Sequence, residues 1–193
     1  MRLVLERCEI RSWETRDVRS LAHHANNRRI WRNVRDQFPF PYSTADAEVW
    51  IRTARSMRPE TSFAIAVDGE AVGAIGIELK DDVYRRSAEI GYWLGEPYWG
   101  RGITSEALTA FTNWVFGHFA LDRLYAHVFE WNPASARVLE KAGYGLEARM
   151  RRAVIKDGQT IDVLLYAMLP DHGSPPENEP SPSGSNGGAP DAA

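Results

Sequence analysis

Cysteine is almost absent from the chain, and long apolar runs are missing altogether. Cys8 is the single cysteine among 193 residues, so no disulfide can form within the chain, as expected in a reducing cytoplasm. No apolar run approaches the ~18 residues of a membrane-spanning helix. Charged residues interrupt the N-terminal segment MRLVLERCEIRSWE too often for a signal peptide. We therefore expect a cytoplasmic protein that does not insert into membranes.

A strong charge of either sign is missing too. The 23 Lys and Arg residues against 26 Asp and Glu residues give a formal net charge of −3, which gives no reason to expect nucleic acid as a partner. With 44% apolar residues, a chain of this length can bury the core of one domain. No metal-ligand spacing is present among the five histidines, which are His23, His24, His118, His127 and His172. We therefore expect no bound metal.

Large apolar residues are lacking from the C-terminal segment. Residues 171–193, DHGSPPENEPSPSGSNGGAPDAA, consist mainly of Pro, Gly, Ser and Asn. Burial of such a segment cannot offset the entropy lost on ordering it. We predict one folded domain over residues 1–170 and a disordered tail over 171–193. That tail is either simply solvated or binds a partner.

Periodic patterns within residues 1–170 predict an α+β fold. Helices are predicted over 17–25, after Ser43, over 104–117, and from Asn132 to Gly143. Ser43 with Asp46 forms a capping-box pattern, and Asn132 with Pro133 is typical of a helix start. Strands are predicted over 88–94 and 123–129, with hairpins over 63–77, turning at Asp68-Gly69, and over 149–168, turning at Asp157-Gly158.

A glycine loop joins a predicted strand to a predicted helix in YWLGEPYWGRGITSEAL, residues 92–108. Glycines let the backbone approach an anion, and the unpaired N–H groups of a helix start point toward it. A dinucleotide fingerprint would need a third glycine where Ser105 stands. An ATP-binding P-loop would need Lys and Ser or Thr where Arg101 and Gly102 stand. Neither motif is therefore present.

The loop instead resembles the pyrophosphate loop of the GNAT superfamily of N-acetyltransferases, Gln/Arg-x-x-Gly-x-Gly/Ala. Gly100 and Gly102 match its glycines, and Pro97 replaces its first residue. The segment NPASARVLEKAGYG, residues 132–145, is similar to the helix that faces coenzyme A in that superfamily. Glu89 lies on the strand before the loop, as the family's pattern requires.

The segments PYWGRGITSEAL and NPASARVLEKAGY follow the RimJ/RimL-type branch of the superfamily, which acetylates protein N-terminal amines. The resemblance covers about residues 6–169. It implies a central mixed, mostly antiparallel sheet flanked by helices, and acetyl transfer from acetyl-CoA to an amine without a metal. The assembly is expected to be a monomer or a homodimer, and the sequence does not decide between them.

The resemblance also implies which residues contact acetyl-CoA. They come from the strand, the loop and the following helix: Tyr92, Trp93, Leu94, Gly100, Arg101, Gly102, Ile103, Thr104, Ser105, Asn132 and Ser135. Arg101 equally fits a solvated surface arginine, and Thr104 or Ser105 equally fits a helix cap. Asn132 can cap its helix and bond the pantetheine arm at once.

Glu89 and Ser135 are the catalytic candidates that the resemblance implies. Many family members use a tyrosine seven residues after the asparagine as the acid, but Leu139 stands there. Ser135 is therefore the candidate donor to the leaving thiolate, or else a small residue on a helix surface. An α-amine with a pKa of about 7.7–8.0 is partly neutral near pH 7. A weak base such as Glu89 then suffices, directly or through water, unless Glu89 is only an ion-paired strand carboxylate.

The acceptor is the open question. Trp31 and Tyr42 lie where family members bind the acceptor, although each also fits the core. Arg149, Arg151 and Arg152 form a solvated strand face or attract an acidic substrate. We expect a protein N-terminal α-amine as acceptor. The alternatives are a small-molecule amine (a polyamine, an amino acid or an antibiotic) and a non-catalytic acyl-CoA-binding module.

Overall fold

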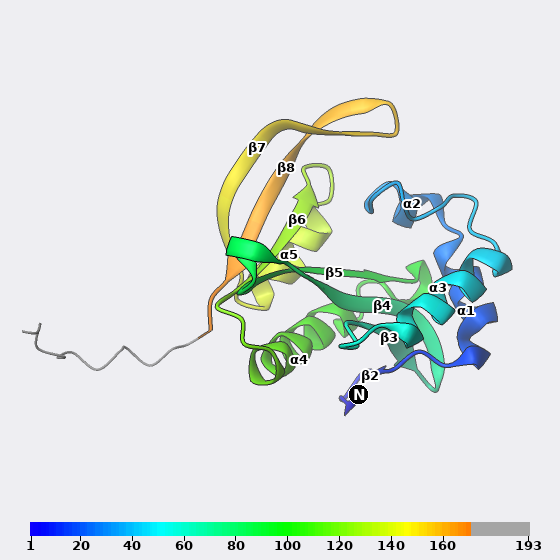
Figure 1. The fold of residues 1–193 in the computed structure, drawn as a ribbon. Coiled ribbons are helices and arrows are strands. Elements are labelled where there is room, and N and C mark those ends of the chain that lie inside the picture. Colours follow the sequence, from blue (N-terminus) through cyan, green and yellow to red (C-terminus); the bar gives the residue numbers. More distant parts are fainter. Residues whose placement is uncertain (171–193) are drawn as a thin grey trace, which may run out of the picture.

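One mixed sheet of eight strands organises the molecule (Figure 1). The computed structural model describes residues 1–170, so the tail predicted over 171–193 lies outside the described residues. The strand order is β1-β2-β3-β4-β5-β6-β8-β7, and every neighbouring pair is antiparallel except β5 with β6. This confirms the predicted mixed, mostly antiparallel sheet.

The strands and helices have the following bounds. The strands are β1 (Arg2–Val4), β2 (Glu9–Arg11), β3 (Ser62–Val67), β4 (Glu70–Leu79), β5 (Ser87–Leu94), β6 (Arg123–Phe129), β7 (Gly145–Lys156) and β8 (Gln159–Met168). The α-helices are α1 (Val18–Ala25), α2 (Arg28–Trp31), α3 (Thr44–Ser56), α4 (Ile103–His118) and α5 (Pro133–Lys141). Short 3-10 turns are η1 (Thr15–Asp17), η2 (Asp82–Tyr84) and η3 (Glu96–Tyr98).

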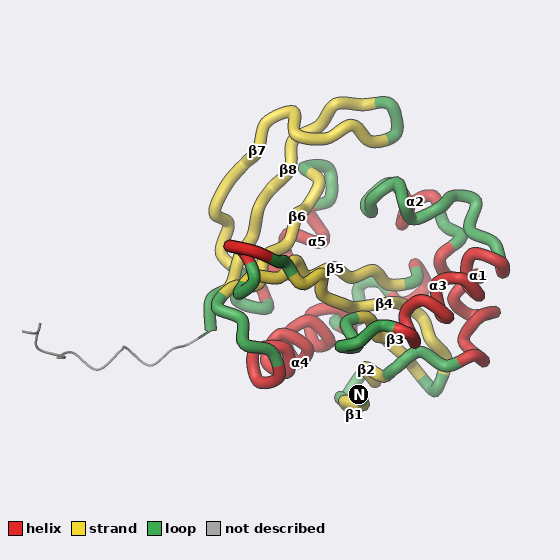
Figure 2. The backbone as a smooth tube through the Cα atoms, in the orientation of Figure 1, coloured by secondary structure: helices red, strands yellow, loops and turns green. Residues whose placement is uncertain are grey.

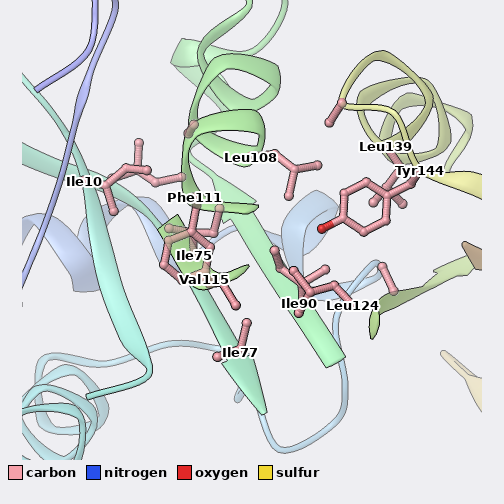
Figure 3. Close-up of a cluster of buried hydrophobic side chains, with 14 of the residues drawn as sticks. Ile10, Ile75, Ile77, Ile90, Leu108, Phe111, Val115, Leu124, Leu139 and Tyr144 are labelled. Atoms are coloured by element: carbon pink, nitrogen blue, oxygen red, sulfur yellow. The ribbon is translucent and has the colours of Figure 1, made fainter. Parts of the chain in front are cut away.

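The two faces of the sheet carry separate cores, because side chains alternate along each strand. On one face, residues of α4 pack against β4 and β5, as Figure 3 shows for Phe111 and Ile75. On the other face, α1 and α3 cover Ala64, Ala71 and Ala74. Figure 2 shows these two groups of helices on opposite sides of the strands.

The local signals of the sequence correctly located most element ends. The Ser43 hydroxyl accepts the N–H of Asp46 at 3.2 Å, and the Asp46 carboxylate accepts the N–H of Ser43 at 2.8 Å. Asn132 Oδ1 accepts the N–H of Ser135 at 3.2 Å, which caps α5. Gly143 follows α5 with φ +91°, a value that favours glycine. These caps confirm the predicted starts of α3 and α5.

Three short elements were not predicted. β1, β2 and α2 contain three or four residues each, which is too few for a hydrophobic period to appear. β7 also begins at Gly145, earlier than the hairpin predicted from residue 149, because its first residues are held by pairing with β8. Pairing across the sheet, and not local propensity, makes these segments regular.

The parallel pairing of β5 with β6 stops soon after it begins. It joins Ser87 to Arg123, Ala88 to Leu124, and Glu89 to Tyr125. Beyond that point β5 stays paired with β4, and β6 stays paired with β8. Figure 1 shows β6, β7 and β8 rising away from the plane of β3, β4 and β5. The edge of β5 that faces β6 therefore has no strand partner after Glu89 within residues 1–170.

Candidate active site

The glycine loop presents its backbone to open space at the start of α4. Gly100 and Gly102 have φ values of +75° and +80°, in the left-handed region that favours glycine. A Cβ atom on Gly100 would meet no heavy atom within 4 Å, and one on Gly102 would meet only the side chain of Arg7, at 3.6 Å. The loop backbone can therefore be approached closely by a ligand.

The first turn of α4 is capped without a side chain. Gly102 is the N-cap and makes no side-chain hydrogen bond. Thr104 and Ser105 lie inside the helix, so neither takes the capping role that the sequence left open for them. The N–H groups of Ile103, Thr104 and Ser105 have no acceptor within the helix, since the first turn of any helix leaves them unpaired. This end of α4 therefore attracts an anion.

Two arginines lie at this loop. Arg101 is exposed, and its guanidinium lies 5.3 Å from the centre of the Tyr98 ring. Arg7 was not predicted. The carboxylate of Glu106 accepts the N–H groups of Glu6 and Arg7 at 2.9 and 3.0 Å, which holds the link between β1 and β2 against α4. No local pattern could reveal Arg7, because only the tertiary fold brings this link to α4.

The last residues of β5 face two different environments. Tyr92 packs against the core beneath α4, whereas Trp93 packs against the core beneath α1 and α3. The inner edge of this strand pairs with β4 as far as Leu94. The carbonyl of Leu94 accepts the indole N–H of Trp99 at 2.7 Å. The remaining backbone groups on the outer edge have no ladder partner within residues 1–170.

Tyr92 and Ser135 join β5 to α5 beside this free edge. The Tyr92 hydroxyl lies 2.9 Å from Ser135 Oγ and 3.2 Å from the Ser135 carbonyl oxygen. Burial raises the pKa of Tyr92 to about 12, and the bond to Ser135 lowers it only in part. Tyr92 is therefore protonated near neutral pH. Ser135 is half-buried and its hydroxyl has a partner, unlike a serine on an open helix surface.

Glu89 lies on the opposite face of β5, in a cluster of cations. Its side chain is only 13% exposed, and its Oε2 lies 2.5 Å from Arg35 Nη2 and 3.6 Å from Lys80 Nζ. Its Oε1 lies 3.0 Å from His127 Nδ1. Burial alone would raise the pKa of Glu89, but the hydrogen bonds and charges of His127 and Arg35 hold it at about 2. Such a carboxylate stays ionised near neutral pH and accepts protons weakly.

Glu78 completes this group, which we call the Glu89 cluster: Arg35, Glu78, Lys80, Glu89 and His127. Glu78 stands directly opposite Glu89 in the pairing of β4 with β5. Two like charges in that position repel, but Arg35 and Lys80 bond Glu78 at 2.8 and 2.6 Å as well as pairing with Glu89. The cluster is thus neutral when His127 is neutral. This is the ion-paired arrangement that the sequence left open for Glu89.

One known protein family matches most of the chain. Residues 7–145 match the acetyltransferase (GNAT) domain family. The chain belongs to this family. The first two curated relatives, uncharacterized N-acetyltransferases of Bacillus subtilis and Bacillus licheniformis, are 33% and 32% identical, and the matched segments span 56% and 60% of their lengths.

Other relatives of this GNAT chain carry named activities. The ribosomal-protein-serine acetyltransferase of Escherichia coli is 33% identical over 109 residues, which is 56% of this chain and 60% of that enzyme. A second enzyme of Escherichia coli, the [ribosomal protein uS5]-alanine N-acetyltransferase, is 26% identical over 175 residues. This segment is 87% of this chain and 90% of that enzyme. These relatives place the chain in the RimJ/RimL-type branch.

Solved structures agree on the fold. RimL, described as a ribosomal L7/L12 α-N-protein acetyltransferase in complex with coenzyme A, superimposes with a TM-score of 0.77 at 22% identity, over 86% of this chain and 96% of that one. Mycobacterium smegmatis RimJ, in complex with CoA-disulfide, gives a TM-score of 0.76 at 25% identity. The superposition covers 87% of this chain and 84% of RimJ. The fold is therefore that of GNAT enzymes.

The two aromatic residues expected at the acceptor lie in different surroundings. Tyr42 is 6% exposed, and its ring lies 4.9 Å from that of Phe38 in the core beneath α1 and α3. It is a core residue, which is the alternative that the sequence left open for it. Trp31 is half-buried, and the ammonium of Lys156 lies 3.8 Å from its ring centre. Trp31 thus stays near the surface on the side of the β7–β8 hairpin.

The tip of the β7–β8 hairpin is tied to α2 and the loop after it. Lys156 is almost fully buried and pairs with Asp36 at 2.6 Å. Asp157 pairs with Arg28 at 2.9 Å and with Arg32 at 3.3 Å. These ion pairs hold the hairpin over the side of the sheet that carries the Glu89 cluster. Arg149, in the predicted arginine face, pairs instead with Glu130 and Asp162.

Among residues 1–170, no group of three His, Cys, Asp or Glu residues is placed to hold a metal ion. None of the helices in that range is long and apolar enough to cross a membrane. The histidine that does lie in the site, His127, contacts a carboxylate.

Arg35, Lys80 and His127 were missed as site residues by sequence reasoning. Alternation along the predicted strand 123–129 puts His127 on the same face as Tyr125. Finding its carboxylate partner needs the register of β5 on β6, which pairs Glu89 with Tyr125. Sequence alone gives no register for a parallel pair, and Arg35 lies in a loop with no pattern of its own.

The depressed pKa of Glu89 predicts a pH-dependent contribution to stability. A carboxylate whose pKa falls from 4.5 to about 2 on folding stabilises the protein above pH 4.5, and this stabilisation is lost as the pH falls toward 2. At about 1.4 kcal/mol per pKa unit, it amounts to roughly 3 kcal/mol or less. Glu89→Gln should therefore lower the free energy of unfolding clearly at pH 7 and much less at pH 3, as measured by urea unfolding.

Glu48→Gln is the matched control for this measurement. Glu48 is an exposed carboxylate on α3, so its variant should follow the wild type at both pH values. An equal destabilisation of Glu89→Gln at pH 7 and pH 3 would contradict the assignment of the low pKa to Glu89.

Proposed function

We propose that the protein is an acetyl-CoA-dependent N-acetyltransferase that acts on a primary amine, namely the α-amine of a protein N-terminus. One observation carries the proposal. Where β5 and β6 part, the Tyr92–Ser135 pair lies on one face of β5 and Glu89 with its partners lies on the other. Acyl transfer needs a donor for the leaving group and a polar site for the amine, and this arrangement offers both.

The residues at the glycine loop fit the phosphates of acetyl-CoA. The loop backbone is open, and unpaired N–H groups lie at the start of α4. The nearby carboxylates are already engaged: Glu96 is bonded by Asn27 and Arg29, and Glu106 by backbone N–H groups. Arg29 pairs with Glu96, and Arg7 lies 3.9 Å from Glu106, so two cations partly offset the charge of these carboxylates. The free edge of β5 supplies backbone groups for the pantetheine amides. The side-chain N–H groups of Asn132 can bond the pantetheine as well, because only its Oδ1 is used in capping α5.

Ser135 is the residue proposed to assist the leaving sulfur. Acetyl-CoA supplies an acetyl group on a thioester, whose cleavage leaves a thiolate. The Ser135 hydroxyl can donate a hydrogen bond there while it accepts one from Tyr92 at 2.9 Å. A serine held in this way has a defined direction, which a freely rotating hydroxyl lacks. Leu139, at the position of the usual tyrosine, is fully buried and offers no acid.

We place the acceptor amine on the face of β5 that carries Glu89, and call it the acceptor face. This face favours an α-amine over a lysine side chain. The α-amine has a pKa of about 7.7–8.0, against about 10.4 for lysine, so its neutral form is far commoner near pH 7. The pKa of Glu89 is about 2, so this carboxylate is a weak base. An acceptor that is already partly neutral suits such a site. The names of the Escherichia coli relatives, which act on ribosomal-protein serine and on uS5 alanine, support this choice.

The proposal is tested by offering the protein acetyl-CoA and a set of amines. Peptides with a free N-terminal serine or alanine should release thiol and gain an acetyl group on the α-nitrogen, as located by mass spectrometry. The same peptides with a blocked N-terminus and an internal lysine should react much more slowly, for the pKa reason given above. Acetylation of polyamines or amino acids alone would contradict the N-terminal acceptor. No thiol release with any amine would leave only an acyl-CoA-binding module.

The glycine loop predicts selective stabilisation by acetyl-CoA. A ligand of the folded state raises the melting temperature, so acetyl-CoA should raise it and ATP with magnesium should do so much less. Gly102→Val should lose most of the effect, because a side chain there fills the space over the loop. Gly69→Val is the control, since Gly69 has a similar φ of +83° in the β3–β4 turn and shares the backbone strain. Equal stabilisation by ATP and magnesium would overturn the loop assignment.

Ser135→Ala should lower turnover at every pH tested. A positioned proton donor contributes about 10²–10⁴-fold, and the loss should lie at the lower end if water substitutes. Affinity for acetyl-CoA, measured by calorimetry, should change little, because the loop is untouched. Ser56→Ala is the control: Ser56 is also a helix serine, and it donates to the carbonyl of Thr53. Near-wild-type turnover of Ser135→Ala would return Ser135 to a purely structural role.

A further inference from the structure

His127 has one ring nitrogen bonded and the other free. Its Nδ1 lies 3.0 Å from Glu89 Oε1. An ionised carboxylate only accepts hydrogen bonds, so the contact requires the proton of a neutral His127 on Nδ1. Nε2 then carries a lone pair. No hydrogen bond from residues 1–170 engages Nε2, and the side chain is 32% exposed.

This free nitrogen lies where the acceptor face is open. His127 is two residues beyond Tyr125, the last residue of β6 paired with β5. Its neighbours Ala126 and Val128 point into the core on the other face. On β5, Gly91 shares the face of Glu89 and Trp93, and a Cβ atom there would meet no heavy atom within 4 Å. The chain leaves this face bare beside His127.

Glu89 is badly placed to take a proton itself. Both of its oxygens are engaged, Oε1 by His127 and Oε2 by Arg35 and Lys80. Moving a proton onto Glu89 would break up a group of compensating charges. A proton on His127 Nε2 leaves these contacts intact, and the imidazolium so formed lies against the carboxylate.

We infer that His127 takes the proton from the acceptor amine and that Glu89 is a positioning residue that fixes its orientation and tautomer. The inference rests on the proposed function. As the amine nitrogen bonds to the thioester carbonyl carbon, one N–H proton passes to Nε2. The electrons of the C–S bond leave with sulfur, and the thiolate takes a proton from solvent by way of the Ser135 hydroxyl. The imidazolium then returns its proton to solvent.

The charges around His127 are compatible with this cycle. The charged and titratable groups around it are Glu78 on β4, Lys80 directly after β4, Glu89 on β5, Tyr125 on β6 and Arg35 in the loop between α2 and α3. On β8 its neighbour in the ladder is Leu165, which is apolar. Two carboxylates offset two cations, so the charged groups around His127 carry no net charge together. The contact with Glu89 at 3.0 Å then stabilises the imidazolium.

The test compares turnover of an N-terminal peptide by wild type and by His127→Asn. The asparagine amide keeps a donor near the place of Nδ1 but has no lone pair at the place of Nε2. Turnover should fall by about 10²–10⁴-fold, the contribution of a positioned base, while the KM for acetyl-CoA and the melting temperature change little. The acid limb of the pH profile of kcat should disappear. Added imidazole should restore part of the activity to His127→Ala. His23→Asn, an exposed histidine on α1, should behave as wild type.

Glu89→Gln separates the two roles. The glutamine oxygen can still accept the bond from Nδ1, so this variant should keep part of the rate and retain the acid limb. If Glu89 were the base, Glu89→Gln would lose that limb and His127→Asn would keep it, which would overturn the inference. Nitrogen-15 NMR of histidine-labelled protein reads the tautomer without turnover. A neutral His127 with its proton on Nε2 would overturn the inference as well.

The failure of this inference differs from the failure of the proposed function. An active wild type with near-normal turnover in His127→Asn contradicts the histidine base alone. A wild type that acetylates no amine contradicts the proposed function, and with it the inference.

Discussion

The separation of β5 from β6 is the constraint on which the site depends. The two strands pair in parallel only from Ser87 to Glu89 on one side and from Arg123 to Tyr125 on the other. After that, β5 is held by β4 and β6 by β8, so neither strand can follow the other. Within residues 1–170, the backbone groups that a continuous sheet would pair therefore stay open to a ligand. The same separation allows side chains from both faces of β5 to reach one region.

Alternation along β5 then divides the chemistry between two faces. Tyr92 meets Ser135 of α5 on the face covered by α4 and α5, while Glu89 meets Arg35 and His127 on the face of α1 and α3. At ~3.3 Å per residue, the three steps from Glu89 to Tyr92 span about 10 Å along the strand. A thioester lying across this edge would have its leaving group on one side and the acceptor on the other.

Charge compensation changes how Glu89 should be understood. An isolated strand carboxylate near a binding site is a natural candidate for a base, but three cationic or potentially cationic partners hold the pKa of Glu89 at about 2. Glu89 then contributes a negative charge and a fixed geometry to the site, as the carboxylate of a catalytic triad does. The proposed proton acceptor is the partner that it orients, His127. The hairpin tip, tied by Lys156 and Asp157 to the region around α2, closes the same side.

The sequence by itself determined the features that short-range physics controls. The caps at Ser43 and Asn132, the turns at Gly69 and Gly158, and the glycine loop at Gly100 and Gly102 are recognisable because each depends on a few neighbouring residues. The tertiary structure alone decided the contacts that depend on register and long loops. His127 meets Glu89, 38 positions away, and Arg35 reaches the same carboxylate from a loop. Tertiary packing likewise placed Tyr42 in the core and the Arg7 side chain beside the glycine loop. Local sequence encodes a strand's alternation, but strand pairing decides which side chains meet across it.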